Sequence, residues 1–356
     1  MSRMDQADSL MRQAVADRVF PGGVLLVAQS GSIRFFKAYG LANIFTGRPM
    51  TCDTIFDLAS LTKPLATTLT AMKLVQQNKL TIDQPVAEIL PEFKNTDKAG
   101  IRIAHLLAHV SGLPDYRPYY HELCAHPLKN RKNMLLTLLQ NEPLAYATGQ
   151  KTIYSDLGFM LLHLLIEKIA GCSLDTFVTR EVYQPLGIKD LFFIDVCDGP
   201  PESAFAATED CRWRNRVLEG VVHDENAYAL GGVSGHAGLF GTAEAVCALL
   251  LHLLQGTGGS PGLFAPALLR RFLSRYSPYE RALGFDMPAE TGSSAGEYFQ
   301  RETSVGHLGF TGTSFWMAMD RSIIIMLLTN RIHPRRDNEA IRQFRPILHN
   351  ALMARI

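Results

Sequence analysis

Apolar runs of strand length stand near both ends of this chain, and they constrain its fold more than any other feature. Each end carries two such runs around a short turn, at Ser30-Gly31 and at Asp320-Arg321. Runs of this kind around a turn predict β-hairpins. The four runs are residues 24–29, 33–39, 314–319 and 322–329. We therefore expect both ends of the chain to contribute to one antiparallel sheet.

Helical spacing of apolar residues replaces this pattern elsewhere in the chain. It covers residues 4–18, about 338–353, and much of the middle. We predict an α+β fold, with an antiparallel sheet flanked by N- and C-terminal helices and joined to a mostly helical lobe. The sheet lobe is expected at residues 1–64 and 226–356, and the helical lobe at 65–225. Because ligand sites favour domain interfaces, the active site should lie in the cleft between the lobes.

Charge and composition limit the classes of partner. The chain has 35 Lys and Arg against 34 Asp and Glu, so no nucleic-acid partner is expected. No run of 18 apolar residues occurs, and we expect no membrane partner. The first residues, Met-Ser-Arg-Met-Asp, are polar and no apolar signal segment follows, which predicts a cytoplasmic location. The sequence leaves the oligomeric state open.

A candidate nucleophile stands at Ser60, followed by Lys63 and Pro64. On a helix, Ser60 and Lys63 share one face about one turn apart. A proline is tolerated only in the first helical turn, so Pro64 places Ser60 near a helix N-terminus. Unpaired N–H groups and the helix dipole there favour an alkoxide or an oxyanion. Serine needs a nearby base, and a lysine whose pKa is lowered can serve as one.

Alone, this tetrapeptide also fits an N-cap serine followed by an exposed lysine. Other chemistries have less support. Ser234 is not in a G-x-S-x-G elbow, because His236 stands where the second glycine is needed. His105 and His109 have the spacing of a zinc pair, but the sequence offers neither an H-E-x-x-H motif nor an evident third ligand. We expect neither a metal nor a cofactor.

Three segments in chain order carry a resemblance to a known family. They are Ser60-Leu-Thr-Lys63-Pro, Tyr154-Ser-Asp156 and Gly306-His307-Leu-Gly309-Phe310-Thr311. They resemble the three motifs of the S-x-x-K penicillin-recognising hydrolases, which include class C β-lactamases, DD-peptidases and family VIII-type esterases. The resemblance extends from about residue 20 to 330 and implies a β-lactamase/DD-peptidase-like fold.

The resemblance also implies roles for individual residues. Ser60 would attack a carbonyl carbon, Lys63 and Tyr154 would share the proton transfers, and His307 would lie beside Tyr154. Backbone N–H groups of Ser60 and Phe310 would form the oxyanion hole. The positions implied to contact substrate are Asp156, Gly309 and Thr311.

Three positions depart from the family pattern. Asp156 replaces the usual Asn, and a carboxylate near Lys63 favours the protonated lysine, which would shift the base role towards Tyr154. His307 replaces the common Lys, so a fixed charge becomes pH-dependent. Leu308 replaces a Thr and removes a hydrogen bond. These changes weaken the case for β-lactam hydrolysis and fit an esterase or a peptidase better.

The predicted activity is acyl transfer to water through an acyl-enzyme, with a small-molecule or peptide acyl compound as substrate. A carboxylic ester, a D-alanyl peptide or a β-lactam-like amide would fit. The alternative is a catalytically silent homologue that binds peptides or partners, a possibility raised by Asp156 and Leu308.

Overall fold

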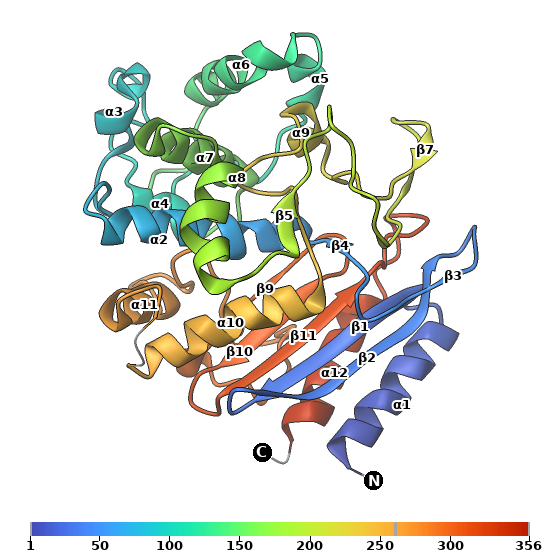
Figure 1. Cartoon of the computed structure of the whole chain (residues 1–356). Helices are drawn as coiled ribbons and strands as arrows, with labels where there is room; N and C mark the ends of the chain where they lie inside the picture. Colours follow the sequence, from blue (N-terminus) through green and yellow to red (C-terminus); the bar gives the residue numbers. More distant parts are fainter. Residues whose placement is uncertain (1, 260–261, 355–356) are drawn as a thin grey trace.

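The structure, a computed structural model, describes residues 2–259 and 262–354. Its main feature is a six-stranded antiparallel sheet with the order β3-β2-β1-β11-β10-β9 (Figure 1). Strand β1, near the N-terminus, pairs with β11, near the C-terminus, and sets Leu25 opposite Leu327. The strands are β1 (Gly22–Gln29), β2 (Ser32–Asn43), β3 (Arg48–Pro49), β9 (Ser304–Leu308), β10 (Ser314–Ala318) and β11 (Ile323–Thr329). The predicted α+β fold, with a sheet built from both ends, is confirmed.

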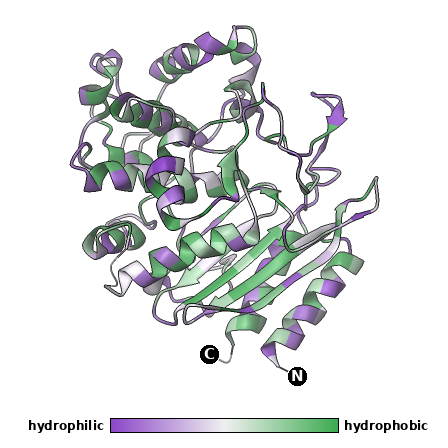
Figure 2. Cartoon of the chain, viewed as in Figure 1, coloured by the Kyte–Doolittle hydropathy of each residue, from purple (hydrophilic) through white to green (hydrophobic). Residues whose placement is uncertain are grey.

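Helices cover both faces of this sheet, which explains why its central strands are apolar along almost their whole length (Figure 2). Alternate residues of a strand point to opposite faces. Leu25 and Val27 pack with residues of α1 (Arg3–Ala16) and α12 (Ile341–Met353). Val24 and Leu26 belong to the larger core on the other face, which includes α10 (Ala243–Thr257). The flanking N- and C-terminal helices therefore share one face.

Helices dominate the part of the molecule above the sheet in Figure 1. They are α2 (Leu69–Gln76), α3 (Val86–Ile89), α4 (Ile103–Leu107), α5 (Tyr120–Leu123), α6 (Leu128–Asn141), α7 (Asp156–Ala170), α8 (Leu174–Val178) and α9 (Glu225–Ala229); α11 (Pro266–Leu273) packs near α10. Residues 187–224 carry short strands and loops rather than helices. The lobe boundaries at residues 64 and 225 stay a prediction.

A three-stranded sheet, in the order β4-β8-β5, joins segments that are far apart in the sequence. Its strands are β4 (Phe56–Asp57), β5 (Leu191–Phe193) and β8 (Leu239–Gly241), and a separate pair is β6 (Asp210–Cys211) with β7 (Arg216–Val217). Strand β4 ends three residues before Ser60, so this sheet fixes where the candidate nucleophile begins. No single helix among the described residues has both the length and the apolar character to cross a membrane, although the bent pair 156–170 and 174–186 passes that test by length and composition.

Candidate active site

The chain reaches Ser60 through a strained turn. Ala59 has a left-handed backbone with φ 47°, which costs a non-glycine residue about 1–2 kcal/mol. Ser60 lies in a single 3₁₀ turn (Ala59–Leu61), and a π-helical turn (Lys63–Thr68) leads into α2. Because Pro64 has no N–H, it cannot make the α-helical hydrogen bond to Ser60, and the wider turn accommodates it. Ser60 therefore lies in the first turn of the helical segment, as Pro64 predicts.

Lys63 is fully buried, and its Nζ is surrounded by oxygen atoms. The Nζ atom donates to Ser60 Oγ at 3.0 Å and to the His236 carbonyl at 3.0 Å, and it lies 2.7 Å from Asp156 Oδ1. An ammonium group has three donors, and three oxygens are present. Burial lowers the pKa of Lys63, but the charge of Asp156 and the neighbouring Tyr154 outweigh burial and raise the pKa above its ordinary value. The resting site therefore holds Lys63 as a cation.

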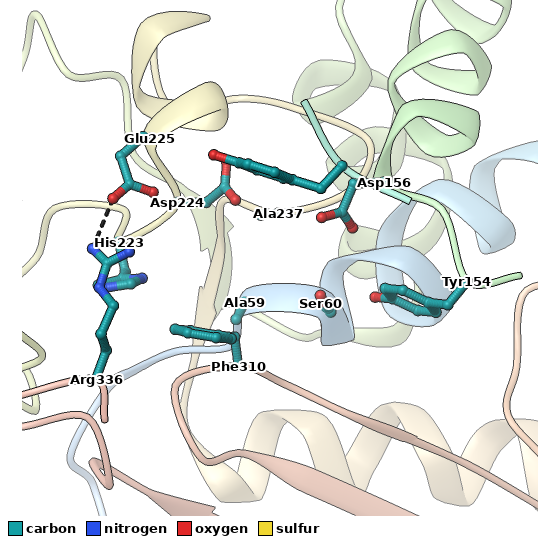
Figure 3. Close-up of a pocket in the computed structure, with 11 residues that line it drawn as sticks. Ala59, Ser60, Tyr154, Asp156, His223, Asp224, Glu225, Ala237, Phe310 and Arg336 are labelled. Carbon is teal, nitrogen blue, oxygen red and sulfur yellow. Dashed lines mark hydrogen bonds and ion pairs between the residues drawn. The ribbon is translucent and has the colours of Figure 1, made fainter. Parts of the chain in front are cut away.

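The Tyr154 side chain points towards Ser60 in Figure 3, and its ring lies beside Lys63, with 4.7 Å between Nζ and the ring centroid. Its hydroxyl is buried and makes no hydrogen bond of good geometry within the described residues. Burial raises the pKa of Tyr154, while the Lys63 charge opposes that rise. A neutral phenol with an unused donor is thus held beside the nucleophile.

His109 supports Tyr154 from below. The two rings stack with centroids 4.7 Å apart, and His109 Nδ1 accepts a hydrogen bond from the Ser155 amide at 3.0 Å. His109 therefore holds the segment that carries Tyr154. His105 does not join it in a metal site: His105 Nδ1 accepts from the Arg102 amide, and no group of three potential ligands occurs in the part of the chain described.

His307 also lies close to Tyr154, with ring centroids 5.9 Å apart. Its Nδ1 donates to the Leu308 carbonyl at 2.9 Å, so Nε2 carries the lone pair of the neutral ring. Burial, with the charges of Lys63 and Arg281, holds the pKa of His307 well below its usual range. His307 therefore supplies no positive charge near neutral pH.

The loop after β9 brings Phe310 to Ser60. Behind it, Thr311 Oγ1 donates to the Asp57 carbonyl at 2.7 Å and Thr313 Oγ1 donates to the Leu58 carbonyl at 3.1 Å. Gly309 must lack a side chain, because a Cβ there would overlap Thr313 Oγ1. Two residues implied to contact substrate, Gly309 and Thr311, are thus placed as braces behind the predicted oxyanion hole and do not line the cavity.

A cavity of about 370 Å³ opens at Ser60, with Tyr154 on one side of Ser60 and most of the other lining residues on the opposite side (Figure 3). Its lining residues come from separate parts of the chain: Ala59, Ser60, Tyr116, Tyr154, Asp156, His223, Asp224, Glu225, Ala237, Phe310 and Arg336. The structure therefore brings together the predicted residues Ser60, Tyr154, Asp156 and Phe310, and Lys63 is buried behind them.

Sequence reasoning missed the far wall of this cavity. Asp224 caps α9, where its Oδ1 accepts from the Ala227 amide and pairs with His236 Nε2, each at 2.8 Å. Burial raises the pKa of Asp224, but His236 and the amide outweigh burial and hold the pKa below its usual value. Glu225 pairs with Arg336 at 2.7 Å. The local signal was the polar run His223-Asp-Glu-Asn226, which carries no recognised spacing.

Comparisons with known proteins find relatives along nearly the whole chain. The Beta-lactamase family model matches residues 7–347. The N-acetylmuramyl-L-alanine amidase of Bacillus subtilis is 34% identical, over 93% of this chain and 81% of that protein. A putative D-alanyl-D-alanine carboxypeptidase of Salmonella agona is 33% identical, over 89% of this chain and 80% of that protein.

Solved structures share the fold over nearly the whole chain. EstCE1, described as a hydrolase with promiscuous acyltransferase activity, has a TM-score of 0.75 at 24% identity and covers 98% of both chains. Simvastatin synthase (LovD) from Aspergillus terreus has a TM-score of 0.75 at 19% identity, over 99% of this chain and 98% of that chain.

Proposed function

The chain belongs to the Beta-lactamase family, and from this premise we propose that it is a serine hydrolase that works through an acyl-enzyme on Ser60. One observation carries the proposal. Ser60 Oγ accepts a hydrogen bond from the buried Lys63 at the mouth of a cavity, beside the buried hydroxyl of Tyr154. Acyl transfer requires a nucleophile, a charge that stabilises it and a group that carries its proton, and Ser60, Lys63 and Tyr154 can supply these three roles.

In the proposed reaction, Ser60 Oγ attacks the carbonyl carbon of an ester or amide. Tyr154 takes the Ser60 proton as it passes its own hydroxyl proton to the leaving oxygen or nitrogen, so the proton count balances. Lys63 stays an ammonium and stabilises charge that develops on Ser60 Oγ and Tyr154 Oη. Water then attacks the acyl-enzyme, its proton returns through Tyr154 to Ser60, and the carboxylic acid leaves.

The chemistry of the cavity supports a substrate class. If Tyr154 serves the leaving group, the cavity on the far side of Ser60 takes the acyl group. Three carboxylates, Asp156, Asp224 and Glu225, line it. Asp156 is paired with Lys63 and Glu225 with Arg336, so Asp224 leaves the cavity with an excess of negative charge. Like charges repel, so an acyl group that carries a free carboxylate is disfavoured.

We propose an uncharged or cationic acyl group joined through an amide to an amino acid or a peptide, as in fragments of the bacterial cell wall. The names of the two curated relatives, an amidase and a putative carboxypeptidase, favour amides of this origin. Carboxylic esters are expected to react as well, because they have the better leaving group. The neutral His307 and the apolar Leu308 argue against efficient recognition of β-lactams.

A fluorophosphonate probe tests the proposal. The purified chain should become labelled at Ser60 and should release a chromogenic acid or amine from acyl substrates, whereas Ser60→Ala should do neither. Ser111→Ala is the matched control, because Ser111 is another buried serine near the site whose Oγ accepts only a local amide, that of Leu113. If the native chain takes up no label at Ser60, the catalytically silent alternative replaces the proposal.

A further inference from the structure

Thr62 stands between Ser60 and Lys63, and its hydroxyl is fully used. The side chain is completely buried. Its Oγ1 donates to the Ala59 carbonyl at 2.6 Å and accepts from the Leu239 amide at 3.0 Å. A hydroxyl has one hydrogen to donate, so this hydrogen is committed to Ala59. Strand β8, which carries Leu239, thereby holds the turn before the nucleophile.

The bond to Ala59 bears directly on Ser60. The Ala59 carbonyl and the Ser60 amide belong to one planar trans peptide, in which C=O and N–H point in opposite directions. Fixing the carbonyl towards Thr62 therefore points the Ser60 N–H away from Thr62. Ala59 and Ser60 both line the cavity, and the Ser60 N–H is the first predicted oxyanion donor.

This peptide needs external anchors because Ala59 holds a left-handed conformation that a non-glycine residue seldom adopts. Asp57 Oδ1 accepts from the Ala59 amide at 2.8 Å, on one side of the residue. Thr62 holds the Ala59 carbonyl on the other side. The strained residue is therefore fixed at both of its peptide groups.

The second predicted donor is tied to the same turn. Thr313 Oγ1, behind the Phe310 loop, donates to the Leu58 carbonyl. Any rotation of the Ala59–Ser60 peptide would thus change the spacing between the two donors. Electrostatic stabilisation of an oxyanion depends on donors that are already in place.

We propose that Thr62 is a positioning residue, whose hydroxyl orients the Ser60 amide for the oxyanion through the Ala59 carbonyl. This inference rests on the proposed acyl-enzyme function. The Ala59 carbonyl also accepts from the Thr62 amide within the 3₁₀ turn, so loss of the hydroxyl removes one of its two hydrogen bonds and leaves the Ser60 N–H less firmly oriented towards the developing charge. The loss should affect the chemical step and leave substrate binding nearly unchanged.

Three variants test the role. Thr62→Val keeps the shape and removes the hydroxyl, and Thr62→Ser keeps the hydroxyl. Thr67→Val is the matched control, because Thr67 is equally buried and donates at 2.6 Å to a carbonyl elsewhere, that of Gly235. The measurements are kcat and KM on a chromogenic ester, the rate of fluorophosphonate labelling, and Tm.

Thr62→Val is expected to lower kcat and the labelling rate by about 10- to 100-fold with KM within about threefold, as for a misplaced catalytic group. Thr62→Ser should recover most of the rate. Thr67→Val should lower Tm comparably and keep kcat. If Thr62→Val does not fold, Thr62→Ala takes its place with the same expected result.

Three outcomes would overturn the inference. A Thr62→Val or Thr62→Ala chain that reacts at the native rate removes the role of Thr62 and leaves the proposed function intact. The role of Thr62 is also removed if Thr62→Val lowers kcat no more than Thr67→Val does at an equal loss of Tm. A native chain that is never labelled at Ser60 overturns the proposed function together with this inference.

Discussion

Asp156→Asn should decide which form of Lys63 works in catalysis. The substitution keeps the side-chain shape, restores the family's usual residue and removes one negative charge 2.7 Å from Lys63 Nζ. In the native chain, burial lowers the pKa of Lys63, and the Asp156 charge, with Tyr154, raises it above 10.5. Without that carboxylate, less opposes the lowering of the Lys63 pKa by burial, so Lys63 loses its proton at a lower pH.

The size of the effect follows from the geometry. An opposite charge within 4–6 Å shifts a pKa by about 1–3 pH units. Lys63 is fully buried and Asp156 is 19% exposed, so solvent screens the pair only weakly. The pKa of Lys63 should therefore fall when the carboxylate is removed, and a pH limb that Lys63 controls should move in the same direction.

The assay is kcat/KM against pH for a neutral chromogenic ester. A raised pKa keeps Lys63 protonated through neutral pH, and deprotonation begins only as the pH rises through that pKa. If the ammonium is the working form, Asp156→Asn should bring the alkaline fall in activity about 1–3 pH units lower. Glu225→Gln is the control, because the substitution removes a charge from the same cavity. Native Glu225 pairs with Arg336 and makes no contact with Lys63.

The opposite result would refute this mechanism. If Lys63 must be a neutral amine to take the Ser60 proton, Asp156→Asn should move an acid limb to lower pH and raise activity near neutrality. A variant with a gain in activity at pH 7, or an unmoved alkaline limb, shows that the cationic form of Lys63 is not what the reaction uses.

Three further predictions follow from the same geometry. A chromogenic ester of a neutral acid should react at least about tenfold faster (~1.4 kcal/mol) than the hemisuccinate ester of similar length, because the cavity is acidic; equal rates at low salt would contradict this. His307→Gln should keep the shape of the pH profile between about pH 6 and 8, since the lowered pKa leaves His307 neutral there; loss of a limb in that range would show that His307 titrates. Gly309→Ala should cost about 1–3 kcal/mol in thermal or urea unfolding and lower kcat, because its Cβ would overlap Thr313 Oγ1; a native Tm would mean that the loop moves freely.

The sheet could be predicted because its information is local. The runs that became β1 and β11 are apolar along almost their whole length, and each is bounded by a turn. Pairing these two runs with each other is the simplest way to bury the apolar side chains of both. Pro64 likewise placed Ser60 by a rule that concerns only its own turn. Motif order then supplied Tyr154 and His307.

The far wall of the cavity could not be predicted because no local rule describes it. Tyr116, Glu225 and Arg336 come from three distant segments and meet only in the folded chain. The two residues that fix Ala59 are close to it in the sequence, but no motif marks them. Asp57 and Thr62 resemble ordinary polar residues in the sequence, and only their bonds reveal what they hold.

The site combines several features that each destabilise a folded chain. A lysine is buried, a histidine nitrogen has no partner among the described residues, and Ala59 is strained. Unpaired buried groups and strained residues cost about 1–3 kcal/mol each and persist only where the surroundings fix them. Here the surroundings are two paired strands. Strand β4 ends at Asp57 and strand β8 begins at Leu239, so the turn is held from both sides. Because this cost is met by packing outside the cavity, substitutions that disable catalysis, such as Ser60→Ala, should leave Tm unchanged or raised, whereas loss of the Thr62 or Asp57 bonds should lower both Tm and kcat.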